Sequence, residues 1–224
     1  TKGESIVMAT QIGAISVFDE AEIRSKLTLD KSVVDCVAKA FLLYSSGDCC
    51  VPPVMQINVA DVGGQTCVKS ASAPGVPGFA VKVSSNFPGN PSLGVAANNG
   101  LFALFDAVTG EVDSLFLDNG YLTQLRTAAA GAVAADLLAR KDAARVCVLG
   151  TGLQARLQAH AVALVRNLSH ISVWGRNGDK ASALASQLHE ELYCEDIVAQ
   201  PGAITSGLRR PSRVGPLIPS HQES

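Results

Sequence analysis

The sequence has few charged residues, few aromatic residues and no long apolar run. Charged residues make up 17% of its 224 residues and aromatic residues 5%. The net charge is only -2, so the chain has neither the basic surface of a nucleic-acid-binding protein nor an acidic tail. No apolar stretch is long enough to span a bilayer. The N-terminal region carries Lys2 and Glu4 but no apolar core of a signal peptide.

The cysteines and histidines show no pattern typical of a metal site or a disulfide framework. No two of the six cysteines are spaced as Cys-x-x-Cys, and none stands at ligand spacing from the four histidines. We therefore expect reduced, mostly buried thiols in a cytoplasmic protein, and no metal site. The histidines are scattered, with His160 and His189 in polar helical contexts, so the sequence supports no Ser-His-Asp or Cys-His set. The cysteines are Cys36, Cys49, Cys50, Cys67, Cys147 and Cys194.

Hydrophobic residues are plentiful, at 47% of the chain, which is enough for a sizeable core in one large or two small domains. Apolar residues at helical spacing predict a short helix capped by Asp19 and a longer one capped by Asp30. An Ala-rich helix is predicted over 124–140, with Thr123 as its cap. Alternating apolar residues between turns predict largely antiparallel strands at 54–59, 66–71, 79–83, 101–105 and 112–117.

These elements predict an α/β protein made of two different parts. Residues 1–122 form an α+β domain, residues 123–142 a connecting helix and residues 143–199 a partial Rossmann dinucleotide-binding domain. Residues 200–224 are turn-rich and basic without periodicity, so we expect a disordered tail there. A dinucleotide-binding fold usually has two βαβαβ halves. Since only the start of the first is recognisable, we expect a truncated Rossmann-type domain.

The clearest functional signal is a strand, a glycine turn and a helix in succession. Val146, Val148 and Leu149 form a short apolar run of strand type, and residues 153–165 have helical spacing. Between them, Gly150 would allow the tight turn and Gly152 would let a phosphate approach without a Cβ in the way. Ala155 takes the third position, where a small residue lets the helix pack on the strand. The unit predicts a pyrophosphate site, although an ordinary strand-to-helix turn has the same pattern.

A second strand over 170–174 closes this unit as βαβ and ends at Arg176 and Asn177. Sites for NAD usually carry an acid here, which binds the ribose hydroxyls. A guanidinium suits a 2′-phosphate instead, so NADPH is at least as well matched as NADH. The alternative is that Arg176 stacks on the adenine or faces solvent.

Three cations in the predicted α+β domain and the connecting helix stand in unfavourable places. Arg126 falls in the first turn of its predicted helix, where it opposes the helix dipole unless it shares an anion with the helix terminus. Thr127 could add a hydroxyl, whereas a simple ion pair with Asp118 is the alternative. Lys69 and Lys82 lie in neighbouring strands, directly opposite if the strands pair in odd register, which is destabilising. A bound carboxylate would relieve both conflicts; two solvated lysines are the alternative.

Four segments together resemble the ornithine cyclodeaminase/mu-crystallin family, over about residues 15 to 198. The similarity looks strongest to the branch of ectoine-utilisation cyclodeaminases. The run 117–131 is far more specific than the glycine turn. The segments are Phe79-Ala-Val-Lys-Val83, Pro88-Gly-Asn-Pro91, Leu117-Asp-Asn-Gly-Tyr-Leu-Thr-Gln-Leu-Arg-Thr-Ala-Ala-Ala-Gly131 and Gly150-Thr-Gly-Leu-Gln-Ala155.

The resemblance implies a substrate and dimerisation domain joined to an NAD(P)-binding domain. It implies that Lys82 and Arg126 bind a substrate carboxylate, with Lys82 near the reacting carbon as the catalytic residue. Lys69 is a further candidate for substrate binding. The candidates for cofactor binding are Thr127, Gly150, Thr151, Gly152, Leu153, Gln154, Ala155, Arg176 and Asn177.

The activity implied is that of an NAD(P)-dependent cyclodeaminase, such as ornithine to proline plus ammonia, or of a ketimine or imino-acid reductase. The expected protein is a cytoplasmic homodimer acting on a small amino or imino acid, with no nucleic-acid or membrane partner. The alternatives are a truncated, non-catalytic homologue and a binding protein like mu-crystallin. Val54 departs from the family pattern of Arg or Lys, Ala96-Ala97 from that of Pro-Thr or Pro-Ser, and the acid-base aspartate of the second Rossmann half is not found.

Overall fold

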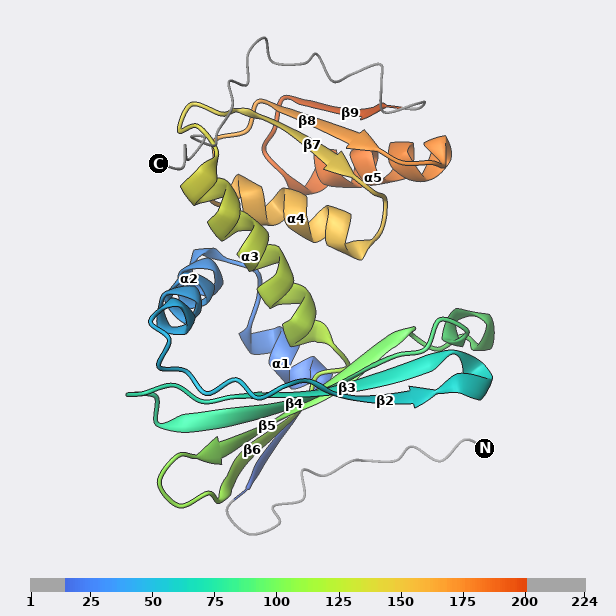
Figure 1. Ribbon diagram of the computed structural model, residues 1–224. Coiled ribbons are helices and arrows are strands. Elements are labelled where there is room, and N and C mark those ends of the chain that lie inside the picture. Colours follow the sequence, from blue (N-terminus) through green and yellow to red (C-terminus); the bar gives the residue numbers. More distant parts are fainter. Residues whose placement is uncertain (1–14, 201–224) are drawn as a thin grey trace, which may run out of the picture. The chain divides into compact units, whose positions relative to one another are not determined.

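The computed structural model describes residues 15–200, which fall into two compact units (Figure 1). Unit 1 comprises residues 15–143 and 157–167, and unit 2 comprises residues 144–156 and 168–200. Most of the tail predicted over 200–224 therefore lies outside the described residues. No helix within residues 15–200 is both long and apolar enough to cross a membrane.

Unit 1 is built on a six-stranded sheet in the order β1-β6-β5-β4-β3-β2. All neighbouring strands are antiparallel except β1 and β6, which are parallel. The predicted α/β fold class with a largely antiparallel sheet in its first part is confirmed. The strands are β1 (Ser16–Asp19), β2 (Met55–Val59), β3 (Gly64–Ala71), β4 (Gly78–Asn86), β5 (Asn98–Asp106) and β6 (Val112–Leu117), with short 3-10 helices η1 (Ala60–Val62) and η2 (Asn90–Leu93).

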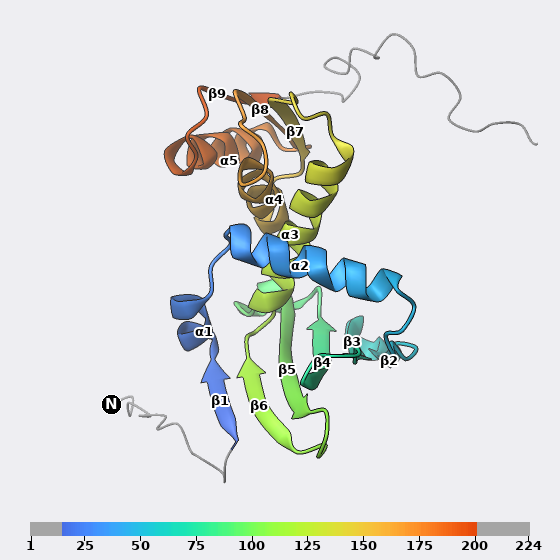
Figure 2. The same cartoon turned by 90° about the vertical axis from the view of Figure 1, so that its left-hand side faces the viewer.

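The helices α1 (Glu20–Lys26), α2 (Lys31–Ser45) and α3 (Tyr121–Leu138) lie on one face of this sheet (Figures 1 and 2). Asp19 and Asp30 cap α1 and α2 through their carboxylates, as predicted. The predicted cap of α3 is wrong. Gly120, in the left-handed region at φ 89°, takes that position instead of Thr123, because a glycine can make the sharp entry from β6 without strain.

The core of unit 1 forms where α3 meets α2 and the sheet. Small side chains on α3, including Ala128, Ala129 and Ala132, pack with Val34 of α2 and let the two helices approach closely. Nearer the start of α3, Tyr121 and Leu125 pack with Ile23, and Phe18 and Phe116 of the sheet lie against them. These clusters anchor α3 to the sheet.

A buried arginine holds the other end of α3. The Arg166 side chain is only 5% exposed. Its guanidinium donates to the carbonyls of Ala135, Asp136 and Ala139 and to the Asp136 carboxylate, at 2.6–3.2 Å. The last carbonyls of a helix have no partner within the helix, so Arg166 satisfies groups that would otherwise be buried and unbonded.

Unit 2 contains a three-stranded parallel sheet in the order β7-β8-β9. Its strands are β7 (Arg145–Leu149), β8 (His170–Trp174) and β9 (Asp196–Gln200). Helix α5 (Gly178–Glu191) packs against β8 and β9, while α4 (Leu153–Ala163) starts in unit 2 and continues into unit 1. Strand β9 was not predicted from the sequence, and Gln200, predicted as the start of the tail, is its last residue. The five-residue run carries too few apolar positions for alternation to identify it.

The expectation of mostly buried cysteines is also wrong. Only Cys194 is buried, whereas Cys36, Cys50 and Cys147 are exposed and the other two are partly buried. All six are free thiols. The physical reason is positional, because an apolar neighbourhood in sequence does not say which face of a strand or helix is covered.

We predict that Arg166→Met destabilises the protein by about 2–4 kcal/mol, because the carbonyls at the end of α3 lose their donors while they stay buried. Urea unfolding monitored by circular dichroism measures the change. Arg140→Met is the matched control, since the side chain of Arg140 is 81% exposed and its ion pair with Asp142 is a surface pair. Equal stability of the two variants would contradict the anchoring role.

Candidate functional site

The register of β3 and β4 places Lys69 directly opposite Lys82, as the odd-register hypothesis predicted. Lys82 is also opposite Phe102 on β5, and its Nζ lies 5.4 Å from the centre of the Phe102 ring. Phe102 in turn pairs with Phe116 on β6. Partners in register share a face of the sheet, so this row lies on the helix-covered face, where Phe116 packs against α1 and α3.

The charge on Lys82 is destabilised by its surroundings. Burial, followed by the nearby charges of Arg126 and Lys69, lowers the pKa of Lys82 from 10.5 to about 8. Asp118 and Cys67 act in the opposite direction. Lys82 is therefore a partly buried ammonium near two other cations, and a bound anion would stabilise its charged form.

Arg126 stands in the second turn of α3, not the first, because the helix starts at Tyr121. The conflict with the helix dipole is correspondingly weaker than predicted. Arg126 is exposed, and no acid within residues 15–200 forms an ion pair with it. The ion pair with Asp118 considered from the sequence is absent from the described contacts, since Asp118 is buried and bonds to the Leu122 N–H.

Arg126 borders a cavity of about 320 Å³. Phe102, Leu122 and Leu125 line it on one side, and Val33 and Val37 of α2 line it on the other. No carboxylate is among its lining residues. Apolar walls with one orienting cation are typical of a site for a small organic acid.

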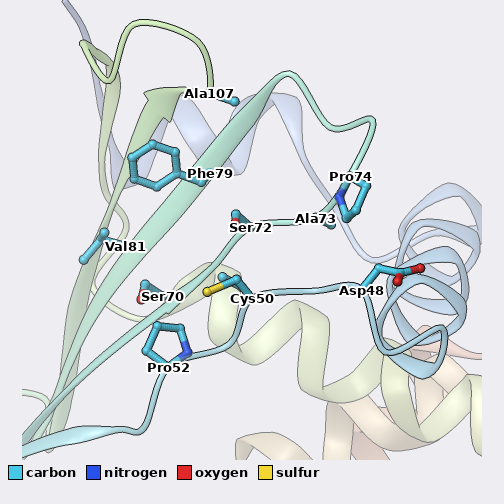
Figure 3. A pocket seen from close by; sticks show the side chains of 11 residues that line it. Asp48, Cys50, Pro52, Ser70, Ser72, Ala73, Pro74, Phe79, Val81 and Ala107 are labelled. Carbon is cyan, nitrogen blue, oxygen red and sulfur yellow. The ribbon is translucent and has the colours of Figure 1, made fainter.

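A larger cavity of about 560 Å³ lies on the other face of the sheet (Figure 3). Ser70, Ser72, Phe79 and Val81 point into it. Side chains alternate along a strand, so these residues face away from Lys69 and Lys82. None of the predicted site residues lines this cavity.

The glycine turn of unit 2 has the geometry of an anion cradle. Gly150 has φ +134°, a conformation that side chains rarely adopt, and its N–H donates to the Trp174 carbonyl at 2.8 Å. A Cβ on Gly152 would meet no atom within 4 Å. Ala155 lies 3.7 Å from a Cβ built on Gly150, so a larger residue would crowd the turn. The space next to Gly152 is open beside the first turn of α4, whose N–H groups have no partner within the helix and are of the kind that can bind an anion.

The other residues predicted to bind the cofactor lie at the start of α4, after β8 and on α3. Leu153 and Gln154 begin α4, and Thr151 packs against Gly175, where a Cβ would collide with it. Asn177 caps α5 by accepting from the Lys180 N–H at 3.0 Å. Arg176 beside it is exposed and forms no ion pair within residues 15–200. In unit 1, the hydroxyl of Thr127 donates to the Thr123 carbonyl at 2.6 Å.

One set of polar residues was not expected from the sequence. His170 contacts Asp196 through Nδ1 at 2.6 Å and Ser172 through Nε2 at 2.8 Å, so a Ser-His-Asp set does exist. It ties β8 to β9, and Ser172 is buried within its strand. A buried serine cannot meet a substrate, so these contacts are structural. Within the described part of the chain, no cluster of three potential metal ligands occurs.

Comparison with known proteins gives consistent matches. A sequence profile of the ornithine cyclodeaminase/mu-crystallin family matches residues 15–202. An uncharacterized cyclodeaminase of Sinorhizobium fredii is 42% identical over 178 residues, which cover 79% of this chain and 54% of that protein. A Delta(1)-pyrroline-2-carboxylate reductase of Bacillus cereus is 32% identical over 172 residues, covering 77% and 53%.

A solved structure agrees with these sequence matches. The Delta(1)-pyrroline-2-carboxylate reductase of Thermococcus litoralis, in complex with NADH and L-proline, has a TM-score of 0.76 and 30% identity. The match covers 84% of this chain and 57% of that one. The chain thus spans about half the length of the curated relatives it matches.

We predict that the free energy of unfolding of Lys82→Met, minus that of the wild type, is larger at pH 7 than at pH 11, by on the order of 1 kcal/mol once solvent screening is allowed for. The folded-state pKa, about 8, lies below the unfolded value of 10.5. The charged lysine is therefore penalised fully below pH 8, and the penalty fades as the pH rises towards 10.5. Thermal unfolding from pH 6 to 11 tests this, with the exposed Lys39→Met as control, because Lys69 itself acts on Lys82. An equal difference from the wild type at pH 7 and pH 11 would contradict it.

Proposed function

The chain belongs to the ornithine cyclodeaminase/mu-crystallin family, and we propose that it serves an NAD(P)-dependent oxidoreduction at the α-carbon of a small amino or imino acid. The observation that carries the proposal is the opposition of Lys69 and Lys82 beside an Arg126 that has no acid partner among the described residues. Like charges directly opposite one another are unfavourable. A bound carboxylate turns this repulsion into attraction.

In this proposal, Arg126 and Lys82 hold the substrate carboxylate. Arg126 offers a planar fork that suits two carboxylate oxygens, and the Lys82 ammonium adds a point charge. Lys69, more exposed, supports binding through its charge. Fixing the carboxylate orients the neighbouring α-carbon, which is how positioning residues lower the barrier of a reaction.

The proposed cofactor is NAD or NADP, held by its pyrophosphate at the turn from Gly150 to Ala155. The open space at Gly152 supports this, because no atom of the described chain lies within 4 Å of a Cβ placed there. When bound, the nicotinamide supplies or accepts the hydride. Arg176 has no acid partner within the described chain, which favours the 2′-phosphate of NADP.

Between the two reactions considered, the cavity favours a reductase. A cyclodeaminase acting on ornithine must accept a second amine, and a buried ammonium without a counter-charge is costly. The lining of the cavity beside Arg126 contains no acid. A cyclic imine such as Delta(1)-pyrroline-2-carboxylate, the substrate in the names of two similar proteins, carries no second amine and places only a small ring there.

A homodimer is the proposed assembly. The edge strand β2 exposes Met55, Ile57 and Val59 by 40–56%, all on one side of the strand. An apolar edge strand without a neighbour invites pairing with another chain. Size-exclusion chromatography with light scattering distinguishes dimer from monomer.

We predict that Gly152→Ala weakens NADH and NADPH binding at least tenfold, equivalent to about 1.4 kcal/mol, because the added methyl occupies the proposed phosphate space. Its melting temperature should not change, since the methyl meets no atom within 4 Å. Isothermal titration measures the affinity. Gly89→Ala, equally free of contacts, is the control and should bind like the wild type. Undiminished binding by Gly152→Ala would reject this cofactor site.

We also predict that the KM for Delta(1)-pyrroline-2-carboxylate rises as the pH increases through about 8, because Lys82 then loses its proton. Lys82→Arg keeps a charge at this position throughout and should flatten the profile. Arg126→Gln should raise KM at least tenfold at every pH. Cofactor binding without turnover of any imino or amino acid would instead support a non-catalytic binding protein.

A further inference from the structure

Asp118 is the only charged residue among the largest fully buried side chains within residues 15–200. Its Oδ2 accepts a hydrogen bond from the Leu122 N–H at 2.8 Å, near the start of α3. Its Oδ1 is buried and has no hydrogen-bond partner. A buried carboxylate with one unsatisfied oxygen is costly. The bond to α3 accounts for Oδ2, but it does not explain why Oδ1 is buried without a partner.

The sheet directs Asp118 towards the cation cluster. Asp118 follows β6 immediately, and its carboxylate bonds to the Leu122 N–H of α3, the helix whose first turns pack with Phe116 on this face. Phe116 pairs with Phe102, and Phe102 with Lys82, in one row across three strands. The Lys82 Nζ lies over the Phe102 ring, which is the ring between Lys82 and β6. The ammonium therefore lies on the side of Lys82 that faces β5 and β6, and Asp118 directly follows β6.

The charges facing Lys82 come from three elements. Arg126 on α3 and Lys69 on β3 oppose its positive charge, while Asp118 after β6 and Cys67 on β3 support it. Among the described residues, Asp118 is the carboxylate that supports this ammonium, and it does so more strongly than Cys67.

We propose that Asp118 is a positioning residue whose free oxygen is the permanent counter-charge of the Lys82 ammonium, keeping it protonated and in place over Phe102. Without such a charge, three cations would crowd one another and the lysine would tend to release its proton. The consequence for carboxylate binding rests on the proposed function, but the effect on the lysine does not.

The test separates charge from capping. Asp118→Asn keeps an oxygen that can accept from the Leu122 N–H but removes the negative charge. The protonation of Lys82 is measured by competitive acetic anhydride labelling of the full chain across pH 6–10, followed by peptide mass spectrometry. The exposed Lys39 is the internal reference. Folding is verified by circular dichroism and thermal unfolding.

We expect the Lys82 labelling midpoint to be near pH 8 in the wild type and about one pH unit lower in Asp118→Asn. Labelling at pH 7 should then be about fivefold faster. Asp118→Glu should stay close to the wild type, and the exposed control Asp61→Asn should not shift. Asp118→Ser, whose hydroxyl can also cap Leu122, replaces Asp118→Asn should that variant not fold. An unchanged midpoint in a folded neutral variant overturns the proposal.

Kinetics supply a second readout. With Delta(1)-pyrroline-2-carboxylate and NADH, Asp118→Asn should raise KM more at pH 8 than at pH 6.5, with a smaller change in kcat, and Asp118→Glu should restore it. Equal KM changes at both pH values would indicate a merely structural role and overturn the proposal. Absence of turnover by the wild type would reject the proposed function, while the labelling experiment would still decide the role of Asp118.

Discussion

The antiparallel register between β3 and β4 is the constraint on which unit 1 depends. It sets Lys69 opposite Lys82, and the next two strands add Phe102 and Phe116 to the same row. A sheet that only had to be stable would not place two lysines there, because their repulsion and the burial of one of them both cost free energy. Such an arrangement is typical of a site whose ligand supplies the missing charge.

Helix α3 connects this row of the sheet to the rest of unit 1. At its start, Gly120 makes the sharp turn and Asp118 binds the Leu122 N–H. At its end, Arg166 binds the last carbonyls. The alanines between them allow close packing against α2. With both ends held, the helix presents Arg126 at a defined position, and a charged ligand is recognised best by groups that are held in place.

In unit 2, the glycine turn is likewise formed by residues whose conformation and small size other residues could not supply. Gly150 adopts a backbone conformation that other residues avoid, and Gly152 leaves open the space into which a Cβ would project. Neither glycine is explained by packing alone. The parallel β7 and β8 with α4 after the turn match the nucleotide-binding unit expected from the sequence.

Several features could be predicted from the sequence because their causes are local. The caps Asp19 and Asp30, the hairpin of β5 and β6 and the strand before Gly150 all follow from neighbouring residues, and the family motifs lie within such segments. The sequence also predicted that Lys69 and Lys82 would lie opposite each other if their strands paired in odd register, because a short turn joins the two strands. The cap of α3 was predicted wrongly because Thr123 is a good capping residue, whereas a glycine in the left-handed conformation depends on how β6 enters the helix.

Sequence alone determined the α/β class, the position of Lys69 and Lys82 on neighbouring strands, and the succession of strand, glycine turn and helix. Alternation, turn residues and helical spacing are each encoded within a few residues. Only the tertiary structure decided that Asp118 is buried with a free oxygen, that Arg166 closes α3 and that His170 joins Ser172 to Asp196. These features depend on burial and on contacts between residues distant in the chain. The physical reason is that the free energy of a charge or polar group is set by what surrounds it after folding, which local pattern does not specify.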